Sequence, residues 1–178
     1  MPEAEGLNKH ELIELLENLG NSLDFDARTE VEASESAWVD VVWFDKHLPV
    51  GEKPFKMRNA LVLPVVAFEV EWGTGLNAKH VKGSVSNLNN LGAQLGVIVI
   101  AQHNLVTLQK LPSHAKENPK ELQKILSDRV NRWVYSEAQA KSRIIVMFER
   151  EFINWAKGLK PSLIGVAPLS AVSPAASP

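Results

Sequence analysis

Residues 38–44 read WVDVVWF, and residues 65–71 read VVAFEVE. β-Branched and aromatic side chains dominate both runs, which favours two buried strands. Acidic residues interrupt each run: Asp40 lies in the middle of the first, and Glu69 and Glu71 lie at the end of the second. Because a buried carboxylate without a partner is unfavourable, we expect these three side chains to be compensated by other groups.

The N-terminal sequence predicts a helix followed by a strand. Asn8 and Glu11 have the spacing of a capping box, and leucines then recur at helical spacing, which predicts a helix over 9–19. Apolar and polar residues alternate over 23–34, which predicts a half-buried strand with an acidic outer face. The almost wholly apolar run at 38–44 then predicts a strand that is central in a sheet.

The middle of the chain predicts a strand–helix–strand unit. Residues 45–64 contain three prolines and one glycine, which is typical of a long connection, with room for a short edge strand at 60–63. After the strand at 65–71, apolar residues spaced three and four apart predict a helix over 78–95. The run VIVIA at 97–101 predicts the next strand, which should lie parallel to the strand at 65–71.

The second half is expected to be mainly helical. Asn118 and Pro119 suit a helix start, which predicts a helix over 119–134. Helical spacing of large apolar residues favours a helix over 137–158, although the letters IIVMF alone would also suit a strand. Residues 1–160 are therefore expected to form a single domain, and residues 161–178 a flexible tail.

Composition excludes several classes of protein. The chain has 178 residues, 45% of them hydrophobic and 22% charged, as in an ordinary globular domain. It contains no cysteine, which excludes disulfides, thiolate metal sites and cysteine nucleophiles. No apolar run approaches the roughly 18 residues needed to cross a bilayer, and the N-terminus is acidic. We therefore expect a cytoplasmic protein without a membrane partner.

Charge is divided along the chain. Residues 1–78 carry 6 Lys and Arg against 15 Asp and Glu, a net charge of −9. Residues 79–160 carry 13 against 6, a net charge of +7. Such a division is typical of solvated helix faces, and it is also what an acidic metal pocket beside a basic phosphate-binding surface would show.

The three acids of the apolar strands suit a metal site. Glu69 and Glu71 are two residues apart, so they point to the same face of the sheet. If their strand neighbours that of Asp40, then Asp40 and Glu69 converge, and convergent carboxylates are what Mg²⁺ uses when it is shared with phosphate. The alternative is that each carboxylate is solvated at a strand end or paired with an arginine such as Arg28 or Arg143.

The order of these features resembles a known family. Asp40 in WVDVV, a long connection, the sequence FEVE at 68–71, a helix and the strand GVIVI are similar to the core of the PD-(D/E)xK superfamily of nucleases, over about residues 8–101. The resemblance implies an α/β fold with a restriction-endonuclease-like core. In that core, helices flank a central mixed β-sheet, and here a helical C-terminal part would follow.

The resemblance also implies which acids would bind the metal. By position, Asp40 and Glu69 would be the Mg²⁺ ligands, and Mn²⁺ would substitute for Mg²⁺. An acid from the preceding helix or strand often joins them, and Glu30 or Glu32 matches that place better than Glu35.

Two motif positions depart from the family: Val39 precedes Asp40 where the family has a proline, and Glu71 stands where the family has a lysine. Glu71 would then act as the general base or as a ligand of a second ion. In other members of the family, the lysine comes from the following helix, and here Lys79 or Lys82 would supply it. That group would offset charge in the transition state.

The function implied is that of a Mg²⁺-dependent endonuclease that hydrolyses phosphodiester bonds in DNA, with type II restriction enzymes among the candidate classes. Its partners would be double-stranded DNA and a second copy of the chain, since cutting both strands commonly takes two sites. One alternative is the same fold without activity, binding nucleic acid or a protein partner. A glycosidase using Glu69 and Glu71 as an acid–base pair is disfavoured, because such carboxylates rarely lie two apart on one strand.

Overall fold

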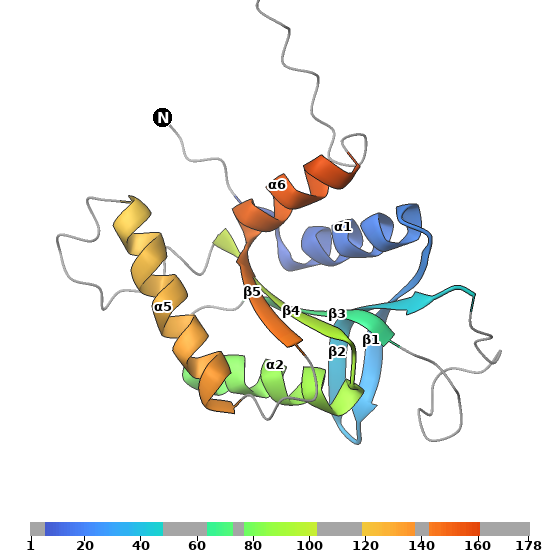
Figure 1. Ribbon diagram of the computed structural model, residues 1–178, viewed down its shortest axis with the longest axis horizontal. Helices are drawn as coiled ribbons and strands as arrows, with labels where there is room; N and C mark the ends of the chain where they lie inside the picture. The colour runs from blue at the N-terminus through green and yellow to red at the C-terminus, as the bar shows by residue number, and fades with distance from the viewer. Residues whose placement is uncertain (1–5, 48–63, 73–76, 103–118, 138–142, 161–178) are drawn as a thin grey trace, which may run out of the picture.

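The computed structural model describes residues 6–47, 64–72, 77–102, 119–137 and 143–160. These residues form a five-stranded β-sheet with helices on both faces (Figure 1). The predicted arrangement of a mixed sheet flanked by helices is therefore confirmed. None of the described helices combines the length and apolarity needed to cross a bilayer.

The elements follow the expected order over most of the chain. Their bounds are α1 Lys9–Ser22, β1 Phe25–Ser34, β2 Ala37–Asp45, β3 Pro64–Glu71, α2 Ala78–Leu91, β4 Leu95–Ile100, α5 Pro119–Glu137, β5 Arg143–Phe148 and α6 Glu149–Leu159. The predicted edge strand at 60–63 and the tail at 161–178 lie outside the described residues.

The sheet has the order β1-β2-β3-β4-β5. Strand β2 is antiparallel to both of its neighbours, β1 and β3, whereas β4 lies parallel to both β3 and β5. The predicted parallel pairing of the strands on either side of α2 is confirmed. The strand that contains Asp40, β2, is an interior strand but not the middle one.

Two apolar clusters hold the layers together, one on each face of the sheet. Helices α2 and α5 cover one face, and α1 and α6 cover the other (Figure 1). The cluster on the α2 side contains Val42, Val85 and Ile98, among others. On the α1 side, Trp43 stacks on Phe25 and contacts Phe68. The two faces of the sheet are thus fixed independently.

The helix predicted over 137–158 is wrong in its first part. Residues Arg143–Phe148 form β5, and the helix begins only at Glu149. The β-branched side chains of Ile144 and Val146 pack against the α2-side cluster, while β5 pairs with the edge of β4. The four-residue spacing that suggested one helix therefore runs across the junction between a strand and a helix.

The C-terminal ends of three helices also differ from the prediction, one of them because α5 continues past 134 to Glu137. Helix α2 ends at Leu91 because Gly92 adopts a left-handed conformation with a φ of 74°. Helix α1 continues past Gly20 to Ser22. Gly20 is buried against Trp43, whose indole Nε1 donates a hydrogen bond to the carbonyl of Leu16 at 3.0 Å. Gly20 thus serves close packing, not helix termination.

We predict that Gly20→Ala destabilises the protein although alanine is the better helix former. A Cβ at this position would overlap the indole ring of Trp43, and overpacking of this kind costs about 1–3 kcal/mol. Gly83→Ala in α2 is the matched control, because a Cβ there meets nothing within 4 Å. It should stabilise the protein by about 0.5–1 kcal/mol. Urea unfolding measures both, and two changes of the same sign would contradict the packing described.

Candidate metal centre

The candidate site lies where β2 separates from β3. The ladder between the two strands ends at Val41 and Phe68. Beyond it, the Asp40 carboxylate takes the place of a backbone acceptor: its Oδ2 accepts a hydrogen bond from the Val70 N–H at 2.7 Å. Asp40 is therefore held by β3 itself, next to the acids of that strand.

The backbone is irregular around Asp40. Val39 and Val42 both pack in the α2-side cluster, so the alternation of side chains along β2 is interrupted between them. On β1, Glu30 lies between the pairs Thr29–Val41 and Val31–Val39, opposite Asp40. Glu30 has a positive φ of 50°. The strand pair thus bends at the position of the site.

Glu69 is the buried acid of the site, with only 7% of its surface exposed. Its Oε1 accepts a hydrogen bond from the Asn87 side chain at 2.9 Å. Burial raises the pKa of Glu69 to about 8, and the negative charge of Asp40 adds to this effect. The Asn87 bond lowers the pKa, and the charge of Glu71 and a hydrogen bond to Asp40 raise it. Asp40 and Glu69 are therefore direct neighbours, as the sequence predicted.

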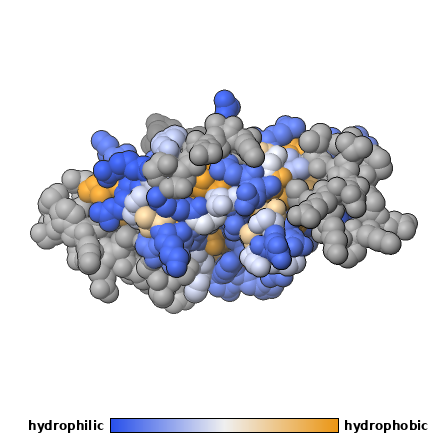
Figure 2. All heavy atoms as spheres, turned by 90° about the horizontal axis from the view of Figure 1, so that it is seen from below, coloured by the Kyte–Doolittle hydropathy of each residue, from blue (hydrophilic) through white to orange (hydrophobic). Residues whose placement is uncertain are grey.

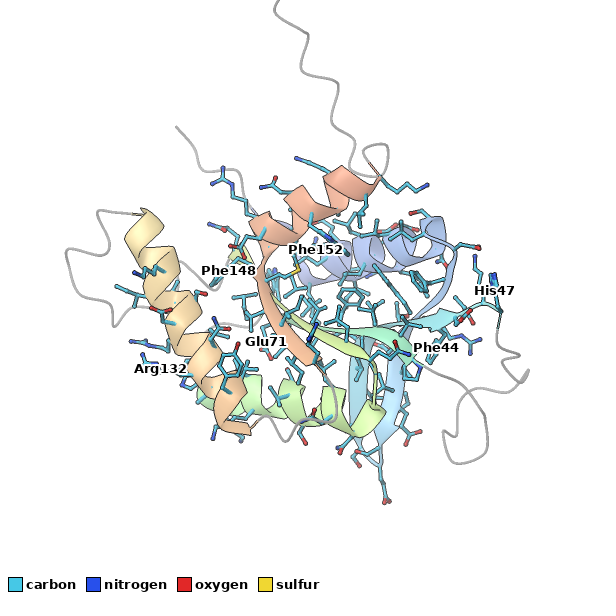
Figure 3. The ribbon with its side chains drawn as sticks, in the orientation of Figure 1. Phe44, His47, Glu71, Arg132, Phe148 and Phe152 are labelled. Carbon is cyan, nitrogen blue, oxygen red and sulfur yellow. The ribbon has the colours of Figure 1, made fainter. Side chains whose placement is uncertain are left out.

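Glu71 points to the same side of the sheet as Glu69. Its Oε1 accepts a hydrogen bond from the Ser84 hydroxyl of α2 at 2.5 Å. Figure 3 shows Glu71 on the α2 side of the sheet, whereas Phe152 lies on the α6 side. The charge of Glu71 acts on Glu69, so the three predicted acids share one region.

A lysine from α1, which sequence reasoning missed, contacts the site. Lys9 Nζ lies 2.9 Å from Asp40 Oδ1. The Lys9 side chain is 48% exposed and that of Asp40 15% exposed, so this pair contributes at most about 1 kcal/mol. Of the two arginines considered as partners, Arg28 bonds to Asp26 at 2.6 Å, and Arg143 is exposed at the start of β5. Asp40 thus has a cationic partner, but from a helix that carried no such prediction.

The other predicted site residues lie farther out. Glu30 is exposed, and within the described residues no hydrogen bond or ion pair joins it to Asp40 or Glu69. Lys79 is exposed in the first turn of α2. Lys82 is half-buried on the same helix, which also supplies Ser84 and Asn87. The structure therefore brings Asp40, Glu69 and Glu71 together and leaves the roles of Glu30, Lys79 and Lys82 as predictions.

Two residues that orient the acids were also missed. Ser84 lies within the apolar stripe formed by Val81, Val85 and Leu88, and a serine at such a position is a detectable signal. Asn87 has no comparable signal, because it lies one position outside the stripe. It donates to both Glu69 and the Trp38 carbonyl, the second bond at 3.2 Å, so it joins the hairpin end of β2 to the acidic site.

The donor set fits a divalent cation of the Mg²⁺ type. Over the described ranges, no three His, Asp or Glu side chains form a ready-made metal-binding group. Mg²⁺ usually takes only one or two carboxylates and completes its shell with water and substrate phosphate. Two adjacent acidic side chains, one of them buried, meet that requirement. Asp40 and Glu69 would hold the ion.

Comparisons with known proteins do not identify a family. The sequence matches no protein-family model, and no curated protein is significantly similar to it.

We predict that the metal-free protein loses stability as pH rises toward 8. The pKa of Glu69 is about 8 in the folded state and 4.5 when unperturbed, so the folded state binds this proton more tightly. Its contribution to stability is complete below pH 4.5 and is lost as the pH rises through about 8.

Urea unfolding at several pH values between about 5 and 9 measures this dependence. Glu69→Gln should flatten it, whereas Glu14→Gln, an exposed change on α1, should leave it intact. If the wild type gained stability over this range, or if Glu69→Gln kept the full slope, the assignment of the proton to Glu69 would be wrong.

Proposed function

We propose that the chain is a Mg²⁺-dependent endonuclease that hydrolyses phosphodiester bonds in DNA. The observation that carries this proposal is the contact between Asp40 and Glu69 at the point where β2 separates from β3. A buried carboxylate beside a second one is unfavourable in the free protein. A divalent cation would offset both the free-energy cost of burying the charge and the repulsion between the two carboxylates.

The topology supports the proposal as well. A helix, three antiparallel strands, a helix and a strand parallel to the third follow in the order expected for a restriction-endonuclease-like core. Asp40 on β2 and Glu69 on β3 occupy the places that the resemblance assigns to the two metal ligands. We infer that residues 8–101 form this core, with β5 and the C-terminal helices added to it.

Each acid would have a separate task. A bound Mg²⁺ supplies a Lewis acid for the phosphate and lowers the pKa of a bound water. The Val70 N–H holds Asp40, and Asn87 holds Glu69, so both ligands are oriented before the ion arrives. Glu71, oriented by Ser84, would accept the proton of the attacking water.

The outer face of α2 suits a nucleic-acid backbone. Lys79, Ser86 and Asn90 are exposed there, beside the helix residues that hold the acids. Figure 2, which shows the molecule from below the view of Figure 1, presents a mainly hydrophilic surface with small hydrophobic patches. Trp38, two residues from Asp40, is 55% exposed and would be available to stack on a base. The proposed partners remain double-stranded DNA and a second copy of the chain, which would form a homodimer.

A binding module without activity is the second candidate. Glu71 in place of the lysine that the resemblance implies favours it. A glycosidase has less support, because Glu69 and Glu71 lie on one strand instead of facing each other across a cleft.

We predict that the protein binds Mg²⁺ or Mn²⁺ and that Asp40→Asn removes this binding. Isothermal titration calorimetry measures the heat of binding in the absence of substrate. Asp45→Asn, at the other end of β2, is the matched control and should bind like the wild type. A wild-type chain that binds no divalent cation would exclude the nuclease and leave the binding module.

Plasmid nicking then separates an active nuclease from a binder. Removal of a ligand in Glu69→Gln should lower the nicking rate about 100-fold or more, and Asn87→Ala should lower it roughly 10- to 100-fold because it disorients Glu69. Glu14→Gln, an exposed change on α1, should be neutral. If Glu71→Ala stayed fully active while Lys82→Ala was inactive, the general base would be misassigned and the α2 lysine would carry the missing positive charge.

A further inference from the structure

Glu71 stands where the resemblance would place a lysine, so a basic group at the proposed site would have to come from elsewhere in the chain. A basic group contacts one of the two proposed metal ligands: Lys9 Nζ lies 2.9 Å from Asp40 Oδ1. We propose that Lys9 is the basic residue of this site. It neutralises Asp40 in the metal-free protein, gives Asp40 up to the divalent cation, and then contacts the substrate phosphate. This inference rests on the proposed nuclease function.

The place of Lys9 in its own helix is the first argument. Lys9 is the first residue of α1, next to the N-cap Asn8. The helix dipole makes this end positive, so a lysine is disfavoured there and an acid such as Glu11 is favoured. Local helix chemistry therefore does not account for Lys9, whereas the charge of Asp40 does.

Hydrogen bonds to Leu7, just before α1, hold the start of the helix near the site. The buried Glu149 carboxylate accepts hydrogen bonds from the backbone N–H groups of Leu7, at 2.7 Å, and Gln102, at 2.6 Å. The Trp72 indole, directly after Glu71, donates to the Leu7 carbonyl at 2.9 Å. These bonds place the start of α1 over the C-terminal ends of β3 and β4, which is the edge that carries the acids.

The ion pair between Lys9 and Asp40 can also open to let a cation bind Asp40. Lys9 is about half exposed, and its long side chain can move while the helix stays in place. Asp40 keeps its hydrogen bond from Val70 when the lysine leaves, so the ligand would remain oriented. A cation that competes with Mg²⁺ for Asp40 and stays within reach is in position to meet the phosphate that the metal binds.

The test uses calorimetric titration of the full chain with MgCl₂ and nicking of supercoiled plasmid at saturating Mg²⁺. Lys9→Met should bind Mg²⁺ roughly two- to fivefold more tightly, which is the worth of a half-exposed ion pair, because the competing charge is gone. Its nicking rate should nevertheless fall about 100-fold, as expected for loss of one transition-state contact. Lys9→Arg keeps the charge and should retain most of the activity.

Controls separate this role from others. Lys46→Met removes a comparable exposed lysine, paired with Asp24 at 3.1 Å, and should change neither value. Lys9→Met with wild-type Mg²⁺ affinity and wild-type nicking would overturn the inference while the nuclease stands. Loss of thermal stability with unchanged affinity would reduce Lys9 to a structural role, and loss of nicking in Lys82→Met but not in Lys9→Met would transfer the role to α2. A wild type that binds no Mg²⁺ would overturn the nuclease and the exchange together.

Discussion

The burial of one carboxylate, Glu69, beside a second, Asp40, is the constraint at the centre of this structure. Glu69 is almost fully buried beside Asp40, and its pKa is raised first by this burial and then by the negative charge of Asp40. The metal-free protein accommodates them by keeping a proton on Glu69 and by bringing Lys9 to Asp40. Neither arrangement compensates the acids fully, because the proton on Glu69 removes its charge and the Lys9–Asp40 ion pair is half-exposed. A divalent cation would satisfy both carboxylates at once.

The fold holds these acids apart from the packing that stabilises it. Separate apolar clusters on the two faces of the sheet hold β2 and β3 in place. Asp40 and Glu69, where the two strands separate, are therefore not needed for the packing of the core. Each face also contributes one orienting helix. Helix α2 reaches Glu69 through Asn87, and α1 reaches Asp40 through Lys9. The site therefore depends on α1 and α2 each packing in its observed position on the sheet.

Much of this arrangement was predictable from local pattern. Period-two and period-three-to-four spacing identified the strands and helices around the acids, and the strand–helix–strand order fixed β3 and β4 as parallel neighbours. The convergence of Asp40 and Glu69 followed from the placement of acids in apolar strands. Strand β5 was missed because the run IIVMF suits either structure, and only the free edge of β4 decides between them. Such a decision depends on a strand distant in the sequence, which no local window contains.

The contacts that orient the site were less predictable for a different reason. Lys9 and Asn87 have ordinary polar side chains on helices, and their roles depend on how those helices dock. A lysine at the positive end of a helix is a weak local inconsistency that could have drawn attention to Lys9. For Asn87 no such signal exists, because asparagine on an outer helix face is common.

Paramagnetic broadening by Mn²⁺ tests the central claim most directly. Substoichiometric Mn²⁺ is added to the isotopically labelled protein, and the loss of amide signals in NMR spectra locates the ion. The account predicts that the Val70 backbone amide and the Asn87 side-chain amide broaden first, while the amides of Asp45 and Leu159 stay sharp. Broadening centred elsewhere, or none beyond that of a free ion, would contradict a cation held by Asp40 and Glu69.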